Sequence, residues 1–308
     1  MLPKIAISIG DINGIGIEIA LLSHEKISKI CKPIYCINNQ MLQLAAKELK
    51  VKIPKDFKTF ETKGTFEIKP GIVTKKSGKY SFNSFMDAIK LADQKKVDAI
   101  CTLPINKEAW NKADISFKGH TEVLRDYFNK NAIMMLGCKK MFVALFTEHI
   151  PLKKVPKKIN VEDLSKFLID YQKSVNSNNI GVLGLNPHAS DNGVLGDEEV
   201  DIFKAIKIAN KTLGKKIFTG PLVPDTAFSP MSRKNCKYFV AMYHDQGLAP
   251  LKALYFDQSI NVSLNLPIIR TSVDHGTAFN IAYKNEKVNL KSYINAIKEA
   301  VSLAKSRN

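Results

Sequence analysis

One stretch near the carboxyl end of the chain, residues 243–278, concentrates side chains that perform acid–base, metal and anion chemistry. Histidine, aspartate, lysine, asparagine and arginine residues are interleaved there with glycines and short apolar runs. A hydrophobic core does not need so many polar groups. Two of the six histidines of the chain, His244 and His275, lie in this stretch. We therefore predict that it contributes to a functional site, with His275 in a loop that serves either the cofactor side or the structure.

Three histidines each follow an apolar segment that is predicted to be a strand. They are His149 after residues 141–146, His188 after residues 180–185, and His244 after residues 238–242. The carboxyl ends of parallel strands meet at one edge of a sheet, so the three imidazoles are expected there together. Three neutral imidazoles with one open position form a common catalytic site for Zn²⁺, Co²⁺ or a similar ion. Each histidine taken singly could equally have a hydrogen-bonded structural role, and their dispersed spacing decides nothing by itself.

Around these histidines the sequence supplies groups that bind anions and move protons. Lys252, Asn261 and Arg270 form an anion-binding set, because arginine holds phosphate or carboxylate through two parallel hydrogen bonds. Only four of the 46 basic residues are arginines, so an arginine between two apolar or small neighbours is conspicuous. Asp225 and Asp245 are candidates for the general base, although either could instead orient a ligand histidine.

A further histidine stands at the start of a predicted helix, in the motif Gly-His-Thr-Glu at residues 119–122. Thr121 could cap this helix through its hydroxyl, and Glu122 suits the first helical turn. Capping does not explain His120, which is therefore a candidate for the site.

Segments with strand-like and helix-like patterns alternate along the chain, which predicts an α/β fold. A strand at residues 4–9 leads through a glycine turn at residues 10–16 into a helix, but the turn lacks the G-x-G-x-x-G spacing of a dinucleotide site. Further helices are predicted at residues 80–95, 161–175, 197–213 and 289–306. A chain of 308 residues without internal repeats is long enough for one large unit or two lobes.

Composition limits the class of protein. Hydrophobic residues make up 45% and charged residues 24%, as in ordinary globular proteins. The net charge of +17 suggests nucleic acid, but the lysines are dispersed and arginine is scarce, so a solvated basic surface is the better interpretation. No apolar run approaches the roughly 20 residues of a membrane span, and no signal pattern opens the chain. We expect a cytoplasmic protein whose five cysteines are buried thiols.

Several motifs resemble those of the PdxA family, the 4-hydroxythreonine-4-phosphate dehydrogenases of pyridoxal phosphate biosynthesis. The resemblance covers nearly the whole chain, and residues 243–278 are its most specific part. The other matching motifs are Gly10-Asp11 with Gly14-Ile15-Gly16 and Glu18, residues 119–122, Leu185-Asn186-Pro187-His188-Ala189, and Gly220-Pro221-Leu222 with Asp225-Thr226. The chain departs from the family pattern at residues 12–13, Ile17 and residues 191–192. These departures bear on the preferred substrate more than on the type of reaction.

The resemblance implies a two-lobed α/β/α fold like that of isocitrate and isopropylmalate dehydrogenases, with a mostly parallel sheet and residues 1–308 as a single catalytic unit. It implies NAD or NADP bound without a Rossmann fingerprint, and a divalent ion (Zn²⁺, Mg²⁺ or Co²⁺) on His149, His188 and His244. The residues that it assigns to the phosphorylated substrate are His120, Thr121, Lys252, Asn261 and Arg270. Family members are homodimers with the site at the subunit interface, so the partner chain is expected to complete it.

The reaction expected from this resemblance is the oxidation of 4-phosphohydroxy-L-threonine by NAD, followed by decarboxylation to 3-amino-2-oxopropyl phosphate. Asp225 and Asp245 are the first candidates for the base, and His120 is the third. A dehydrogenase of another phosphorylated hydroxy acid, such as 4-phosphoerythronate, would use much the same motifs. A phosphate acyltransferase of related fold is the rival from another enzyme class, and it would not need three histidines on a metal.

Overall fold

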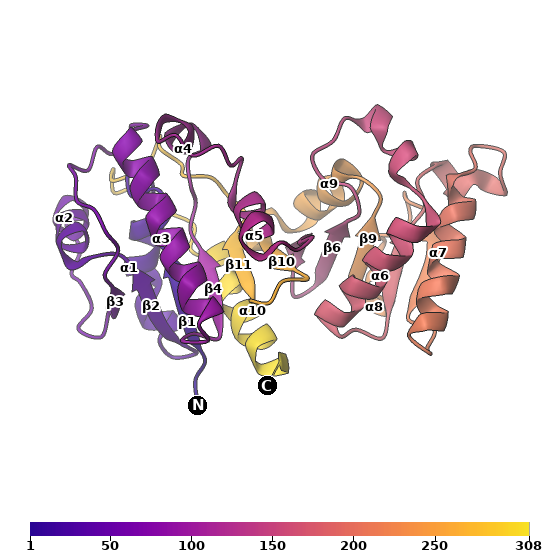
Figure 1. Ribbon diagram of the computed structural model, residues 1–308, viewed down its shortest axis with the longest axis horizontal. Helices are drawn as coiled ribbons and strands as arrows, with labels where there is room; N and C mark the ends of the chain where they lie inside the picture. Colours follow the sequence, from indigo (N-terminus) through magenta and orange to yellow (C-terminus); the bar gives the residue numbers. More distant parts are fainter. Residues whose placement is uncertain (308) are drawn as a thin grey trace. The chain divides into compact units, whose positions relative to one another are not determined.

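The computed structural model describes residues 1–307 and divides into two compact units. Unit 1 comprises Met1–Lys130 together with the segment from Ile260 onward, and unit 2 comprises Asn131–Ser259. Each unit is a mostly parallel sheet flanked by helices (Figure 1). The predicted α/β fold with a mostly parallel sheet is thus confirmed.

The sheet of unit 1 has the strand order β3-β2-β1-β4-β11-β10. All neighbouring strands are parallel except the hairpin of β10 and β11, which is antiparallel. The strands are β1 (Lys4–Ser8), β2 (Lys32–Cys36), β3 (Thr59–Phe60), β4 (Ala99–Thr102), β10 (Ile260–Leu264) and β11 (Arg270–Val273). The hairpin was not predicted, and it places Arg270 on a strand, where its side-chain direction is fixed by the pleat.

The helices of unit 1 lie on both faces of its sheet. They are α1 (Gly16–Ile27), α2 (Asn39–Leu49), α3 (Lys75–Asp93), α4 (Lys107–Lys112), α5 (His120–Phe128) and α10 (Lys291–Arg307). Helix α3 contacts β1, β2 and β4, and Figure 1 shows it crossing these strands. Helix α10 reaches the opposite face, where the Thr271 hydroxyl donates to the carbonyl of Ala296. Helix α3 begins five residues earlier than predicted because Thr74 caps it by accepting from the amide of Ser77.

The sheet of unit 2 has the order β5-β6-β9-β7-β8. Its strands are β5 (Ile133–Cys138), β6 (Met141–Leu145), β7 (Ile180–Leu183), β8 (Phe218–Leu222) and β9 (Tyr238–Ala241). Strands β6, β9, β7 and β8 run parallel, and β5 pairs antiparallel with β6. The pairing of Cys138 with Met141 makes the turn between them shorter than the predicted residues 137–140.

The helices of unit 2 include two that the sequence patterns did not predict, α8 and α9, and α9 starts at His244. They are α6 (Val161–Val175), α7 (Glu198–Thr212), α8 (Pro230–Asn235) and α9 (His244–Tyr255), with short 3-10 segments η1 (Leu152–Lys154), η2 (Pro156–Lys158), η3 (Pro187–Asp191) and η4 (Phe256–Gln258). Helices α6 and α7 agree with the predicted ranges, and they pack side by side (Figure 1).

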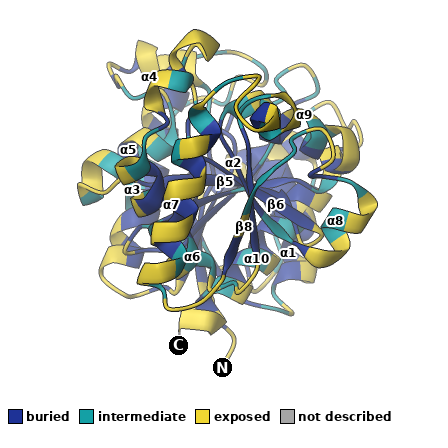
Figure 2. Ribbon diagram, turned by 90° about the vertical axis from the view of Figure 1, so that its right-hand side faces the viewer, coloured by how far each residue is buried: buried dark blue, intermediate teal, exposed yellow. Residues whose placement is uncertain are grey.

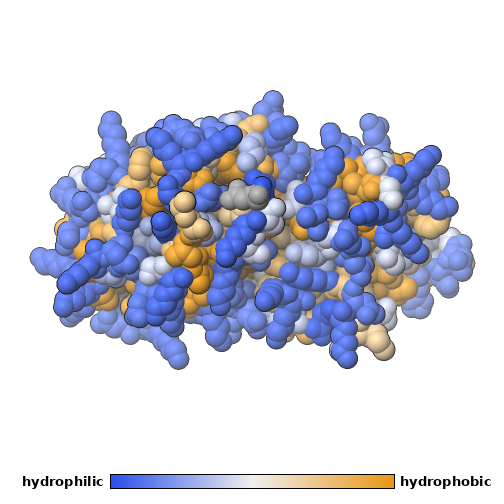
Figure 3. Space-filling view, turned by 90° about the horizontal axis from the view of Figure 1, so that it is seen from below, coloured by the Kyte–Doolittle hydropathy of each residue, from blue (hydrophilic) through white to orange (hydrophobic). Residues whose placement is uncertain are grey.

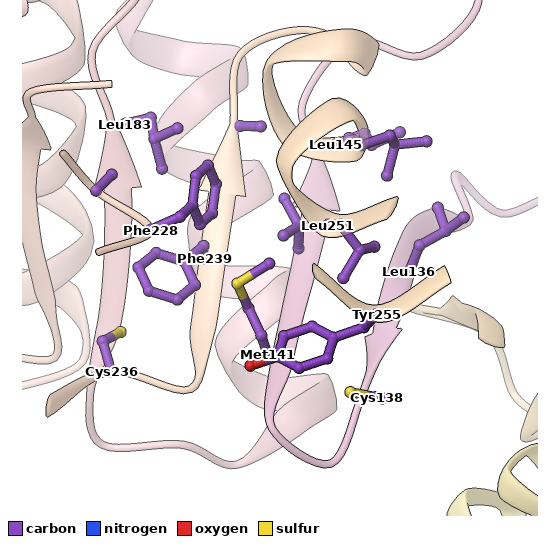
Figure 4. Close-up of a cluster of buried hydrophobic side chains, with 14 of the residues drawn as sticks. Leu136, Cys138, Met141, Leu145, Leu183, Phe228, Cys236, Phe239, Leu251 and Tyr255 are labelled. Atoms are coloured by element: carbon purple, nitrogen blue, oxygen red, sulfur yellow. The ribbon is translucent and has the colours of Figure 1, made fainter. Parts of the chain in front are cut away.

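Helix α9 packs closely on the sheet of unit 2. Leu251 and Tyr255 of α9 lie in one buried cluster with Leu145 and Phe239 from the strands (Figure 4). At Gly247 a Cβ atom would meet Val143 Cγ1 at 2.6 Å, so only glycine lets the helix come this near.

The surface matches the composition. Figure 2 shows buried strands and helices whose outward faces are exposed, and Figure 3 shows a face crowded with hydrophilic side chains. The five cysteines are all buried and free, as predicted. Across residues 1–307, no helix combines the length and the apolar character needed to cross a membrane.

We expect Gly247→Ala to lower the free energy of unfolding by about 1–3 kcal/mol, because the added methyl group overpacks the contact between α9 and β6. Urea unfolding followed by circular dichroism measures this loss. The control is Gly276→Ala, where no heavy atom lies within 4 Å of the new Cβ. Equal stability of the two variants would show that the contact at Gly247 relaxes without cost.

Candidate functional site

The three candidate metal ligands of unit 2 follow neighbouring strands. Strand β9 lies between β6 and β7 and is parallel to both, so the three strands end at one edge of the sheet. His149 follows β6, His188 follows β7 and His244 opens α9 directly after β9. All three histidines are at least partly exposed, and each follows one of these parallel strands.

Two of these histidines are spaced as a metal requires. The ring centroids of His149 and His244 are 5.2 Å apart. Two imidazoles on one zinc ion, with Zn–N distances of about 2.0–2.1 Å and tetrahedral angles, have centroids roughly 5 Å apart. The donor types and this spacing therefore fit a divalent ion. Among residues 1–307, however, no group of three or more histidine, cysteine, aspartate or glutamate side chains is placed to hold a metal.

The aspartate next to His244 orients its ring. Asp245 Oδ1 lies 2.7 Å from His244 Nδ1, which leaves Nε2 as the nitrogen available to a metal. Carboxylates commonly hold ligand histidines in this way and fix their tautomer. Of the two roles considered for Asp245, base or orienting group, the geometry favours the second.

The remaining predicted residues of unit 2 lie near the same sheet edge or on α9. Asp225 is exposed in the loop that follows β8, the strand beside β7. Lys252 is half-buried on α9, with its ammonium nitrogen 5.6 Å from the ring centroid of Phe256. Thr147, which was not predicted, joins two of the strand ends because its hydroxyl donates to the carbonyl of Met242 at 2.6 Å.

Unit 1 contains a buried arginine that no carboxylate neutralises within the described chain. Arg270 is 2% exposed. Its Nε and Nη2 donate to Thr102 Oγ1 at 3.1 and 2.7 Å, and its Nη1 donates to Ser263 Oγ at 3.1 Å. Burial lowers the pKa of the guanidinium to about 10, so it remains charged at neutral pH. A buried cation whose only partners are hydroxyl groups keeps an unneutralised charge, which costs free energy. A bound anion would neutralise this charge and is therefore favoured.

His120 lies beside this arginine at the start of α5. Burial, and then the charge of Arg270, lower the pKa of His120 well below its ordinary value, so the ring is neutral at pH 7. The ring packs edge-on against Phe85 and Trp110, with centroid distances of 4.6 and 5.8 Å. Its Nε2 is buried and has no hydrogen-bond partner in the described chain. It is therefore ready to accept from or donate to a ligand.

Asn261 shares the sheet face of Arg270. In the β10–β11 hairpin Asn261 is opposite Ser272, and Ser263 is opposite Arg270, so alternation places Asn261 and Ser263 on one face. The Oδ1 atom of Asn261 is buried without a partner among residues 1–307. Arg270 offers a charge and His120 an unused ring nitrogen to an anionic group, and the unused Oδ1 of Asn261, which only accepts hydrogen bonds, suits a hydroxyl or amino group of the same ligand.

Thr121 is the second residue of α5 and does not cap it. The N-cap is Gly119, which makes no side-chain cap hydrogen bond, and instead Glu122 accepts from the amide of Lys118 at 2.6 Å. The predicted capping role of Thr121 was therefore wrong, because the helix begins two residues earlier than a Thr121 cap requires.

The glycine turn at residues 10–16 packs closely against two other segments of unit 1, at Pro104 and Thr277. The amide of Asp11 donates to Pro104, the amide of Gly14 donates to Asp11, and the amide of Ile15 donates to Thr277. A Cβ at Gly14 would lie 2.7 Å from the carbonyl oxygen of Thr277. These three amides are committed within the protein and are not available to a dinucleotide phosphate.

The sequence patterns missed the residues that hold the site in place. Thr102, Ser263 and Thr147 carry short hydroxyl side chains with no spacing signal, and the partners of Thr102 and Thr147 are far away in the chain. Their position at or near the end of a strand is the one signal that could have marked them.

The geometry defines a class: an α/β protein with a mostly parallel sheet, a buried arginine held by hydroxyl groups, and three histidines that follow neighbouring parallel strands. The model of the family described as pyridoxal phosphate biosynthetic protein PdxA matches residues 29–300. The chain belongs to this family.

Named relatives agree with the match. The 4-hydroxythreonine-4-phosphate dehydrogenase of Sulfurimonas denitrificans is 61% identical over 300 residues, which cover 97% of this chain and 97% of that protein. The enzyme of the same name from Campylobacter fetus subsp. fetus is 61% identical over 303 residues, with 98% of each chain covered. The crystal structure of a 4-hydroxythreonine-4-phosphate dehydrogenase from Burkholderia phymatum has a TM-score of 0.83 at 31% identity and covers 98% of both chains.

We expect Asp11→Asn to stabilise the protein increasingly as the pH rises. Burial raises the pKa of Asp11 from 3.8 to about 6. The folded state thus favours the protonated acid, and this contribution to stability is present below pH 3.8 and lost as the pH rises through 6. The variant should gain about 2–3 kcal/mol at pH 7.5 and less at pH 4.5, as measured by urea unfolding. The exposed Asp114→Asn is the control, and a loss of stability at pH 7.5 would instead assign Asp11 a required negative charge.

We expect Arg270→Met to separate stability from anion binding. Removing an unneutralised buried charge should leave the free energy of unfolding of the ligand-free protein within about 1 kcal/mol of the original, or raise it. The thermal stabilisation by inorganic phosphate, about 2.7 kcal/mol at 100 times Kd, should disappear. Arg307→Met is the control, since Arg307 donates to the carbonyls of Leu266 and Pro267. A loss above 3 kcal/mol with phosphate binding retained would make Arg270 a structural residue.

Proposed function

We propose that the protein is an NAD-dependent, metal-assisted dehydrogenase that oxidises 4-phosphohydroxy-L-threonine and yields 3-amino-2-oxopropyl phosphate after decarboxylation, in pyridoxal 5'-phosphate biosynthesis. The observation that carries the proposal is Arg270, a buried charge that has no carboxylate partner among residues 1–307 and lies beside the neutral ring of His120. Family membership and the names of the relatives favour a dehydrogenase over the phosphate acyltransferase.

In this proposal the substrate is held by its anionic groups. Arg270 gives the phosphate a charged partner and His120 Nε2 a further contact, while Asn261 Oδ1 accepts from a hydroxyl or amino group of the substrate. Thr121 and Lys252 are proposed as additional contacts. Water is excluded around Arg270 because its neighbours Thr102 and Ser263 are buried, which strengthens each charged hydrogen bond.

The proposed chemistry removes a proton and a hydride from the secondary alcohol. A divalent ion (Zn²⁺, Co²⁺ or Mg²⁺) held by His149, His188 and His244 would lower the pKa of the substrate hydroxyl. NAD, or alternatively NADP, would take the hydride. Asp225 is the preferred base for the hydroxyl proton, because Asp245 is already bonded to the ring of His244. The β-keto acid then loses CO₂ and takes up one proton.

We also propose that the protein is a cytoplasmic homodimer in which the second copy completes the site. Two observations support the dimer. The three histidines do not form a complete metal site within one chain. Exposed apolar side chains also follow His188 closely in the sequence, at Val194, Leu195 and Val200. An interface with a second copy would cover these apolar groups.

The test is the absorbance of NADH formed from 4-phosphohydroxy-L-threonine or from 4-phosphoerythronate, with NAD⁺ or NADP⁺ and with Zn²⁺, Mg²⁺, Co²⁺ or a chelator. We expect turnover of the first substrate and its loss in chelator. His188→Ala and His244→Ala should each lose bound metal and activity together, by at least a hundredfold in kcat/KM.

Each alternative predicts a different outcome of this test. Faster turnover of 4-phosphoerythronate would assign the protein to the second type of dehydrogenase. A chelator-insensitive transfer of acyl groups to phosphate, without any NADH, would support the acyltransferase. A fully active, metal-free His244→Ala variant would contradict the ligand assignment.

A further inference from the structure

The segment that carries His188 has an unusual backbone. Five consecutive residues, 188–192, have φ angles of 53°, 50°, 74°, 45° and 58°, and none of them is glycine. The left-handed conformation costs a residue other than glycine roughly 1–2 kcal/mol, somewhat less for asparagine and aspartate. A run of such residues persists only where the surrounding structure holds it. The position of His188 therefore depends on what holds the chain between β7 and this turn.

A buried glutamate holds this connection from one side. Glu199 is 6% exposed, and its Oε1 accepts from the amides of Leu185 and Asn186 at 2.8 and 2.7 Å. Its Oε2 accepts from Asn186 Nδ2 at 2.8 Å. Glu199 is the second residue of α7, yet all three bonds go to the loop that precedes His188.

A glutamine holds the same connection from the other side. Gln246 Nε2 donates to the carbonyl of Gly184 at 2.7 Å, and Gln246 Oε1 accepts from the amide of Met242 at 2.7 Å. Gly184 follows β7 and Met242 follows β9. One amide group thus ties the strand end that leads to His188 to the strand end that leads to His244.

We propose that Glu199 and Gln246 are positioning residues that fix the two strand ends carrying His188 and His244, and so set the affinity of the protein for a divalent ion whichever copy of the chain contributes each histidine. The inference rests on the metal site of the proposed function. Neither side chain is a ligand in it. Glu199 fixes the direction in which the chain leaves β7, and Gln246 fixes the separation of the two strand ends. Since partners of this kind commonly change metal affinity 10- to 100-fold, the effect is measurable.

The test compares Glu199→Gln with Glu162→Gln. Both glutamates are the second residue of a 15-residue helix, α7 and α6, but Glu162 is exposed. Glutamine has one acceptor oxygen where glutamate has two, so the variant places an amide donor against the donors of the loop. We expect Co²⁺ binding, measured by calorimetry, to weaken 10- to 100-fold in Glu199→Gln and not in Glu162→Gln. The visible absorption of bound Co²⁺, which reports coordination geometry, should change only in Glu199→Gln.

Gln246→Met provides a second, independent variant should Glu199→Gln fail to fold, with Gln172→Met on α6 as its control. We expect the same weakening of Co²⁺ binding, since methionine has similar length but cannot join Gly184 to Met242. In metal-free protein, hydrogen exchange at Leu185 and Asn186 should be faster in Glu199→Gln.

The outcomes separate this inference from the proposed function. If the unmodified protein binds Co²⁺ and both variants bind it equally well, the positioning role is overturned and the metal site stands. If the unmodified protein binds no Co²⁺, the metal site of the proposed function fails, and this inference fails with it. Faster hydrogen exchange at Leu185 and Asn186 without weaker Co²⁺ binding would also overturn the inference, because the hydrogen bonds of Glu199 would then be purely structural.

Discussion

The parallel pairing of β6, β9 and β7 is the constraint on which the candidate metal site depends. Parallel strands end at the same edge, so residues far apart in the chain become neighbours there without any local sequence motif. The pairing fixes only the strand ends, however. The backbone path of the few residues between the end of each strand and the histidine that follows it must also be fixed. In unit 2, hydrogen bonds of the Thr147, Gln246 and Glu199 side chains to the backbone do this.

Unit 1 shows a second constraint, which is electrostatic. Arg270 lies on a strand and is surrounded by hydroxyl groups, and the neighbouring ring of His120 is kept neutral by burial and by that charge. A carboxylate in place of Thr102 or Ser263 would stabilise the guanidinium and compete with an anionic ligand. The chain instead keeps a destabilising unneutralised charge in the ligand-free state, which is expected of a binding site and not of a structural ion pair.

The parts of the structure that the sequence predicted are those with a periodic signal. Apolar runs located β6, β7 and β9, and helical spacing located α6 and α7. Helix α9 was missed because its apolar residues show little helical periodicity. It also contains Gly247 and Pro250, residue types that normally end a helix. The left-handed turn at residues 188–192 had no signal either, since none of its residues is glycine. Glu199 and Gln246 bond to backbone atoms, which sequence patterns do not reveal.

Arg270 was singled out because arginine is scarce in a lysine-rich chain, but the structure shows that scarcity alone does not identify a site. Arg307 donates from two nitrogens to the carbonyls of Leu266 and Pro267, and Arg233 donates to the carbonyl of Phe228 and to the hydroxyl of Tyr255. These arginines also use the planar guanidinium, which lysine cannot imitate. In this lysine-rich chain, an arginine therefore marks a position where several hydrogen bonds are made, whether their role is structural or functional. What distinguishes Arg270 is full burial with partners that carry no charge, and this property appears only once β10, β11 and β4 are paired. The sequence could identify the residue, but the reason for its importance is set by the sheet.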